Sequence, residues 1–350
     1  MEEGIIKKDL YIYGLVPNHY DDEQFKKLNN IGVIRIPFQD ISAIVSQKDK
    51  IDLKQLNTEE LAELMVHHQK TVESLMNMGF NTIIPMRLGT FTNSSTELIR
   101  ILKKEYEIIL DTTAKVKDLI EVEIVSTYAD FGQIIAGIAV HPKVIEMKGN
   151  AESNKLGITQ DDQLSIGYLV KNLLDELKAK YATTITETFQ PLCTTLKQHE
   201  LMNDQMVSNT AFLIPKSKFD LFEQKLDQLD ETLHGKFNFK LVGPLPCYSF
   251  YTMELKSIRL EEIESAQKEL ELDNSTSEKN IQQAYLNKAK FFHPDSNSGE
   301  DTTLIFNQIK KAHKTLLDYI DVIKPASKEE YFSLNTDTVI ENSLFLKIKE

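Results

Sequence analysis

The sequence predicts an α+β fold with two α/β sandwich-like subdomains, followed by an all-α helical hairpin. Three observations lead to this class. Strand-like segments alternate with amphipathic helical segments over residues 1–128. A mostly helical stretch and then a βαββ-like pattern occupy residues 129–255. Residues 256–322 have only helical periodicity and many charges, and residues 323–350 form a less regular tail.

The first subdomain is predicted from strand and helix signals in chain order. Leu10 to Pro17 is rich in β-branched and aromatic residues and ends in proline, which indicates a strand. Asn57 precedes apolar residues at helical spacing and has an acid three positions later, which is typical of a helix N-cap. The other elements are strands at 33–37, 41–46, 83–84 and 119–125 and a helix that begins near Ser94. We expect helices on one face of a sheet, a ferredoxin-like arrangement.

The second subdomain begins with helices, of which Gln163 to Ala182 has the clearest periodicity. Gly, Asn, Ser and charged residues between 148 and 161 predict a loop before it. The remaining elements are a strand at 207–214, a helix from Phe219 to a C-cap at Gly235, and closing strands at 237–242 and 248–253.

Composition excludes several classes of function. The 350 residues are 41% hydrophobic and 27% charged, with a formal net charge of −13. An acidic chain is poorly suited to neutralising phosphates, so we expect no nucleic-acid partner. Cys193 and Cys247 are the only cysteines and lie far apart, which argues against a zinc site or a disulfide framework. We find no Gly-rich phosphate loop and no nucleophile motif, so we expect no cofactor, no metal and no enzymatic activity.

Targeting and membrane signals are missing from the sequence. The N-terminal residues lack a basic region followed by an apolar run, and no stretch approaches the ~20 apolar residues of a membrane span. We therefore expect a soluble, cytoplasmic protein with no membrane partner. The adjacent pair His67 and His68 does not alter the expectation for metals, because neighbouring helical residues do not share a face. His68 falls on an apolar stripe and is predicted to be a packed core histidine.

One tripeptide, His293-Pro294-Asp295, stands between two amphipathic helical segments. The upstream segment follows an N-cap region at 275–278, and the downstream segment ends near Leu317. A plain αα-hairpin with a proline in its loop is one interpretation. The order and spacing over roughly sixty residues also resemble the J domain, the co-chaperone module of DnaJ-like proteins.

The resemblance to J domains implies a partner and a mechanism. The tripeptide would dock on a DnaK-type ATPase and stimulate ATP hydrolysis, with Pro294 fixing the loop, Asp295 facing an Arg of the partner and His293 hydrogen-bonding at the loop. Chaperone contacts are also implied for three residues of the preceding helix: Tyr285, Lys288 and Lys290. This helix has fewer basic residues than is usual in the family. Its lysines stand where apolar residues are common, so they either dock or extend along their own helix.

Residues up to about Leu255 resemble the GvpF/GvpL family of gas-vesicle proteins. The similarity lies in four runs, at 10–16, 84–90, 206–214 and 243–250. The last run is the most telling, because the family favours Gly-Pro-x-Pro-Pro-Tyr-Ser-Phe there. Cys247 replaces the second of the adjacent prolines, which indicates a divergent branch.

Two of these runs provide candidate site residues: Arg87, Gly89, Gly243, Pro244, Pro246 and Tyr248. Two prolines after a glycine make a stiff turn, so the later run is either structural or a direct contact with the shell protein. Arg87 is either a buried ion-pair anchor or part of a binding surface.

The two resemblances together imply a gas-vesicle assembly protein. It would bind the small, very hydrophobic shell protein and other accessory proteins, and bring a DnaK-type chaperone to them. An alternative is a minor structural component of the vesicle with a non-activating, J-like docking module. A general co-chaperone unrelated to vesicles is a third interpretation, which explains only the hairpin.

Overall fold

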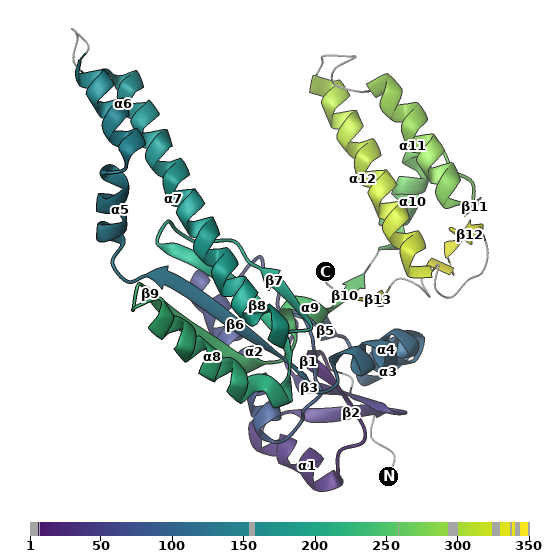
Figure 1. Cartoon of the computed structure of the whole chain (residues 1–350). Coiled ribbons are helices and arrows are strands. Elements are labelled where there is room, and N and C mark those ends of the chain that lie inside the picture. The colour runs from purple at the N-terminus through teal and green to yellow at the C-terminus, as the bar shows by residue number, and fades with distance from the viewer. Residues whose placement is uncertain are drawn as a thin grey trace.

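A mixed α+β body with two helical projections forms the molecule (Figure 1). The structure, a computed structural model, describes residues 6, 8–153, 158–257, 259–292, 300–323, 330–336, 338–339 and 344–348. Within those ranges no helix combines the length and apolar character needed to cross a membrane.

The first sheet is covered by helices on both faces. Its strands are β1 (Leu10–Pro17), β2 (Ile34–Phe38), β3 (Ile41–Gln47), β4 (Ile84–Pro85) and β5 (Phe91–Thr92), all antiparallel, in the order β2-β3-β1-β4 with β5 also on β1. Helices α3 (Ser95–Lys104) and α4 (Tyr106–Val116) bury one face. Helices α1 (Asp22–Lys26), η1 (Lys27–Ile31) and α2 (Thr58–Asn77) bury the other.

The expectation of helices on one face is therefore wrong for this sheet. All eight residues of β1 are buried, with Leu10 and Leu15 in one core and Tyr11 and Tyr13 in the other. A strand buried on both faces is apolar along its whole length, which is the pattern that β1 has. The predicted N-cap of α2 is confirmed, because Asn57 and Glu60 form a capping box.

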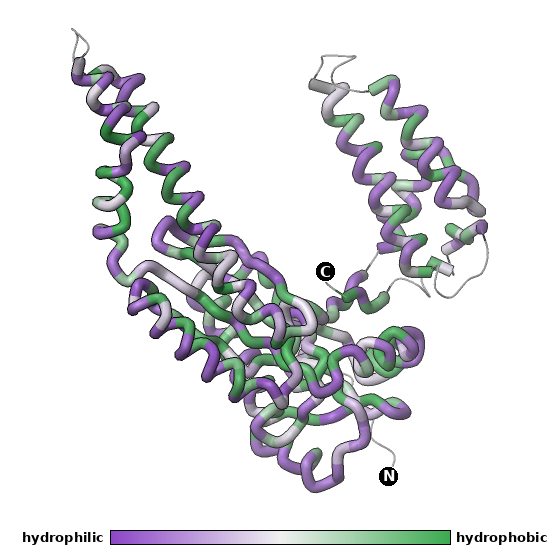
Figure 2. Tube along the Cα trace, in the orientation of Figure 1, coloured by the Kyte–Doolittle hydropathy of each residue, from purple (hydrophilic) through white to green (hydrophobic). Residues whose placement is uncertain are grey.

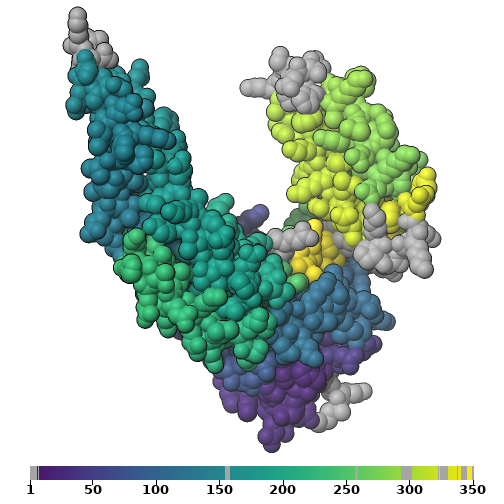
Figure 3. All heavy atoms as spheres, in the orientation of Figure 1, coloured from purple at the N-terminus to yellow at the C-terminus, as the bar shows by residue number. Residues whose placement is uncertain are grey.

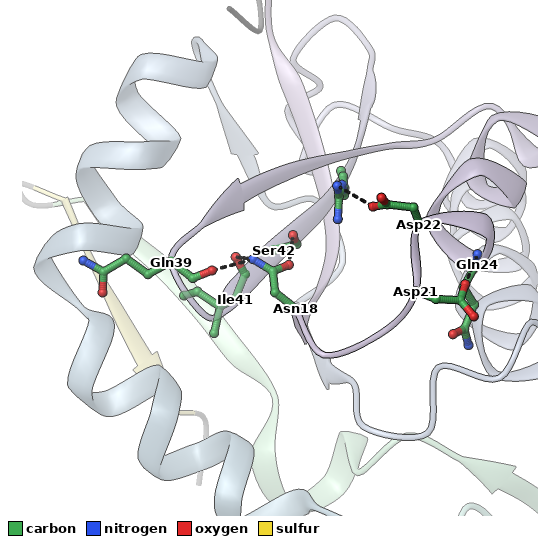
Figure 4. A network of polar contacts seen from close by, with 8 residues as sticks. Asn18, Asp21, Asp22, Gln24, Gln39, Ile41 and Ser42 are labelled. Carbon is green, nitrogen blue, oxygen red and sulfur yellow. Dashed lines mark hydrogen bonds and ion pairs between the residues drawn. The ribbon is translucent and has the colours of Figure 1, made fainter. Parts of the chain in front are cut away.

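The turn between β2 and β3 is tied to the end of β1 by Asn18 (Figure 4). Its side-chain amide donates to the carbonyl groups of Gln39 at 2.7 Å and Ile41 at 2.9 Å, and its side-chain oxygen accepts from the Ser42 hydroxyl. Gln39 has a φ of +48°, an uncommon conformation that needs such support. One side chain thus ties the turn and the start of β3 to the end of β1.

The second sheet is also antiparallel, in the order β7-β8-β6-β9. Its strands are β6 (Leu119–Tyr128), β7 (Thr195–Gln198), β8 (Met206–Pro215) and β9 (Phe237–Leu245). Helix α8 (Phe219–Thr232) and the end of α7 (Gln160–Phe189) pack on it, with η2 (Gln190–Leu192) and η3 (Lys216–Lys218) at the joins. The rings of Phe189, Phe212 and Phe222 fill this core, with centroids 4.4 to 5.5 Å apart. The sequence does not predict β7, because four residues are too few to establish a period.

An arm of helices extends beyond the second sheet (Figure 1). The N-terminal half of α7 projects from the body, and α5 (Phe131–Ala139) and α6 (Pro142–Glu152) pack along it. The predicted loop at 148–161 is therefore too long, since its first residues belong to α6 and its last to α7. We refer to residues 131–189 as the arm.

The start of the C-terminal region differs from the predicted strand. Residues Tyr248–Tyr251 form one helical turn, α9, and the strand β10 starts only at Met253 (Met253–Ser257), so the predicted strand at 248–253 is wrong. Beyond it lie α10 (Leu260–Glu269), β11 (Ser275–Thr276), α11 (Glu278–Phe292), α12 (Glu300–Ile323), β12 (Phe332–Ser333) and β13 (Leu344–Ile348). We call α11 and α12 the helical hairpin. They form one core with α10 and with residues of the C-terminal segment.

Candidate functional site

The helical hairpin is built from local signals and a shared apolar core. The Ser277 hydroxyl accepts from the backbone N–H of Asn280 at 3.2 Å, as expected at the start of a helix. Ile281 of α11 and Ile309 and Leu316 of α12 are fully buried. The tripeptide His293-Pro294-Asp295 lies outside the described residues, between the end of α11 and the start of α12.

The three predicted chaperone contacts on α11 occupy different environments. Tyr285 is half-buried and stacks on His313 of α12, with ring centroids 4.2 Å apart, so its ring supports the hairpin. Lys288 donates to the Glu271 carboxylate at 2.8 Å and lowers the pKa of that carboxyl. Lys290 is exposed. Of these two lysines, Lys288 is thus already paired with a carboxylate of the same chain.

Large apolar side chains stand on the outer surface of the hairpin. Leu286 is 54% exposed and Phe291 is 70% exposed, both on α11, and Leu304 near the start of α12 is 62% exposed. Between Leu286 and Phe291 the exposed positions of α11 are Lys290 and the uncharged Asn287. The outer face of α11 next to the tripeptide is therefore more apolar than basic.

The candidate residues of the later family run form a turn at the end of β9. Gly243 has a φ of +139°, and a Cβ there would lie 3.0 Å from the carbonyl oxygen of Glu121. Pro244 is exposed, whereas Pro246 is buried. The backbone N–H of Tyr248 donates to the carbonyl of Pro246 at 2.6 Å. We call residues 243–248 the proline turn.

A buried carboxylate holds the proline turn and α9 against β6. Glu121 has no exposed surface, and it accepts from both the backbone N–H and the hydroxyl of Ser249, each at 2.7 Å. His199 Nε2 lies 3.1 Å from the Ser249 hydroxyl oxygen and 3.8 Å from a carboxylate oxygen of Glu123. Burial raises the pKa of Glu121 to about 7, although the hydrogen bonds from Ser249 oppose that shift.

This network was not predicted, although the sequence contains a weak signal for it. Glu121 and Glu123 are two acids on the same face of an otherwise apolar strand, which is unusual for a buried position. Their partners Ser249 and His199 come from distant segments. His199 turns the same ring nitrogen, Nε2, to both the Ser249 hydroxyl and Glu123, whereas in a Ser-His-acid triad the acid bonds to the other ring nitrogen, so the geometry favours a structural network.

Arg87 and Gly89 lie where the first sheet meets β10. The backbone N–H of Arg87 donates to the carbonyl of Met253 at 2.8 Å, and its guanidinium pairs with Glu254. The predicted ion pair therefore exists. It lies at the surface and is not buried, because the Arg87 side chain is 49% exposed. Gly89 has a φ of +78°, and a Cβ there would lie 2.7 Å from Leu53, so this position requires glycine.

Of the two adjacent histidines, His68 is buried in the body core and His67 is exposed. His68 is 5% exposed, its Nδ1 lies 2.7 Å from the Tyr11 hydroxyl, and burial lowers its pKa to about 4. His67 Nε2 lies 3.1 Å from the Tyr13 hydroxyl. The prediction that His68 is a packed core histidine is confirmed.

Exposed apolar side chains also occur along the arm. Four of them are more than half exposed: Val140, Ile145, Leu164 and Tyr168. Figure 2 shows that α5, at the base of the arm, is apolar over much of its length. The arm thus presents several exposed apolar side chains along its length.

Known protein families match both the α+β body and the C-terminal helical region. A family model described as gas vesicle synthesis protein GvpL/GvpF matches residues 9–252, and a DnaJ domain model matches residues 268–321. Gas vesicle protein F of Dolichospermum flosaquae is 20% identical over 248 residues, covering 70% of this chain and 98% of the relative. Gas vesicle protein F of a Nostoc species is 21% identical over 187 residues, covering 53% of this chain and 76% of the relative.

Two solved structures share the fold of the body. The crystal structure of GvpF from Anabaena sp. PCC7120 has a TM-score of 0.57 at 19% identity, covering 69% of this chain and 97% of that chain. The structure of GvpF from Microcystis aeruginosa has a TM-score of 0.56 at 20% identity, covering 69% and 98%. Because the family model spans most of the sequence, the chain belongs to the gas vesicle GvpL/GvpF family, with a DnaJ domain following the family segment.

Proposed function

We propose that this protein assists gas vesicle assembly in the cytoplasm by binding the shell protein and recruiting a DnaK-type chaperone to it. It would act through protein contacts, together with other accessory proteins, and not as an enzyme. The observation that supports this most strongly is the presence of a DnaJ domain in the same chain as a GvpL/GvpF body.

Chaperone recruitment is assigned to the helical hairpin. The proposal places His293, Pro294 and Asp295 at the contact with the ATPase, with Asp295 as an anion for an Arg of the partner. The well-formed core beneath the hairpin supports it, because a rigid scaffold is what a binding loop requires. Lys290 and the apolar side chains of α11 would flank this contact.

Shell binding is assigned to the body and the arm. A very hydrophobic shell subunit would expose apolar surface before assembly, and such surface favours contact with other apolar side chains. The exposed side chains of the arm, among them Leu164 and Tyr168, offer a contact of this kind. Figure 3 shows the arm and the helical hairpin projecting on the same side of the body, with open space between them.

The test of chaperone recruitment is the steady-state ATPase rate of a DnaK-type chaperone with the wild-type protein and with Asp295→Asn. Stimulation by the wild type and its loss in the variant are expected. Asp318→Asn makes the same chemical change at an exposed position of α12 and should retain full stimulation. No stimulation by the wild type would contradict recruitment.

A second candidate, a minor structural component with a non-activating docking hairpin, is favoured by the pairing of Lys288 with Glu271 inside the protein. Vesicle yield in cells separates the two functions. His293→Gln should reduce the yield if the chaperone is recruited, and leave it unchanged if the hairpin serves only for docking. Capture of the shell protein by both the wild type and His293→Gln would show that the variant body is intact.

A further inference from the structure

We call the helical hairpin, together with α10 and the C-terminal residues that share its core, the hairpin domain. The C-terminal strand β13 lies where the body and the hairpin domain meet. Adjacent side chains of a strand point to opposite faces, and here they enter two different cores. Phe345 is 7% exposed and belongs to the core of the hairpin domain. Leu346 is 6% exposed and belongs to the core of the first sheet.

On the body side, β13 forms a two-stranded sheet with β10 beside the first sheet. It pairs with β10 in antiparallel register from Met253 opposite Ile348 to Ser257 opposite Leu344. Strand β10 is in turn bridged to the first sheet through Met86 and Met253. Helix α3 packs on β13, and the Glu105 carboxylate accepts the backbone N–H of Leu346.

On the other side, the C-terminal segment closes the core of the hairpin domain. Strand β12 pairs with β11, and the backbone N–H of Leu334 donates to the carbonyl of Asn274 at 2.8 Å. The hydroxyl of Tyr319 on α12 donates to the carbonyl of Ser333 at 3.2 Å. Phe332, Leu334 and Val339 are buried in the same core as Phe345.

The connectivity has a mechanical consequence. The chain enters the hairpin domain from β10 and returns to the body through β13, and these two strands are neighbours in one ladder. A domain held by one linker can swing about it, whereas a domain held by two paired strands can swing only if the ladder opens. Figure 1 shows this ladder between the body and the base of α12.

We propose that β13 is an intramolecular clasp, with its Phe345 side in the hairpin domain and its Leu346 side in the body, which holds the hairpin in one orientation relative to the arm. If the proposed chaperone recruitment is correct, a chaperone bound at the hairpin loop would then approach the arm from one direction. The clasp itself does not depend on that function.

The test measures the distance between the arm and the hairpin in the full chain. Spin labels at Lys180 of α7 and Lys314 of α12, both exposed, would report it by pulsed electron resonance in a Cys193→Ser background. The wild type should give a single narrow distance distribution. Leu346→Asp and Phe345→Asp should each broaden it, and Lys347→Gln, at an exposed position of the same strand, should not.

Two further measurements keep the test decisive. If an aspartate variant fails to fold, as judged by circular dichroism, Leu346→Ala and a chain that ends at Ser343 replace it, and both should broaden the distribution. A broad distribution in the wild type, or a narrow one in every folded variant, would overturn the clasp. ATPase stimulation is measured in parallel. If Leu346→Ala broadens the distance distribution and still stimulates the ATPase, orientation and recruitment are independent. Failure of the clasp can then be told apart from failure of chaperone recruitment.

Discussion

The helical hairpin and the proline turn both have strong family signatures, yet they are built in opposite ways. The hairpin exposes large side chains on its outer face, with Leu286 at 54% and Phe291 at 70% exposure. The proline turn folds over Glu121, which has no exposed surface. Exposed side chains on a rigid scaffold can contact a partner, whereas a turn around a buried acid is first required for folding. Substitutions should therefore affect partner binding in the hairpin and stability in the turn.

The largest expected effect of a single substitution on stability is at Gly243. Gly243→Ala would place a methyl group 3.0 Å from the carbonyl oxygen of Glu121 at a φ of +139°. We expect a loss of about 2–3 kcal/mol in the free energy of unfolding, measured by urea denaturation. Gly149→Ala is the control, because a Cβ there has no neighbour within 4 Å and α6 should gain slightly. Equal stability of the two variants would show that the turn is not strained.

The buried carboxylate should make stability depend on pH. The pKa of Glu121 is about 7 in the folded protein and near 4.5 when unfolded. Its stabilising effect is complete below pH 4.5 and is lost as the pH rises through 7, by up to about 3 kcal/mol. Unfolding measured from pH 5 to pH 8 should show this decline in the wild type and a smaller one in Glu121→Gln. The exposed Glu223→Gln should keep the wild-type slope, and an identical slope in all three proteins would contradict the assignment.

A smaller effect is expected on the outer face of the hairpin, provided that the chaperone is recruited. Leu286→Ser should raise the concentration needed for half-maximal ATPase stimulation about tenfold, because a leucine contact would be lost. Stimulation should also fall only slightly with salt, since Lys288 is engaged by Glu271. Asn287→Ser, at the adjacent exposed position, is the control. A steep salt dependence with no effect of Leu286→Ser would instead assign the contact to Lys290.

The smallest expected effect on stability is at Arg87. Arg87→Gln removes an ion pair with Glu254 in which the arginine is half exposed, so the loss should be under about 1 kcal/mol. Glu254→Gln removes this pair and also the pair of Glu254 with Lys256 at 2.9 Å, so its effect should be somewhat larger. Capture of the shell protein tests the alternative role. If Arg87→Gln alone reduces capture, Arg87 belongs to a binding surface, and if neither variant does, it is a structural anchor.

The parts of the fold that follow from neighbouring residues could be predicted. The helices of the hairpin and the capping box at Asn57 both appear as expected. Tyr248–Tyr251 was wrongly predicted as a strand because its aromatic residues favour one. The backbone of Tyr251 instead bonds to the carbonyl of Cys247 at 2.8 Å, and the hydrogen bonds of Ser249 to Glu121 hold the helical turn.

The site residues also divide into those that neighbouring residues predict and those that they do not. The order of residues along the chain was enough to identify the tripeptide at 293–295, because helix caps and apolar periodicity depend on neighbours a few positions away. The partners of the proline turn could not be found in this way, since Ser249 and Glu121 are 128 positions apart and meet only when β6 and β9 pair. The role of β13 could not be predicted either. Phe345 and Leu346 point to opposite faces of the strand, and they enter two different cores only after the body and the hairpin domain have come together.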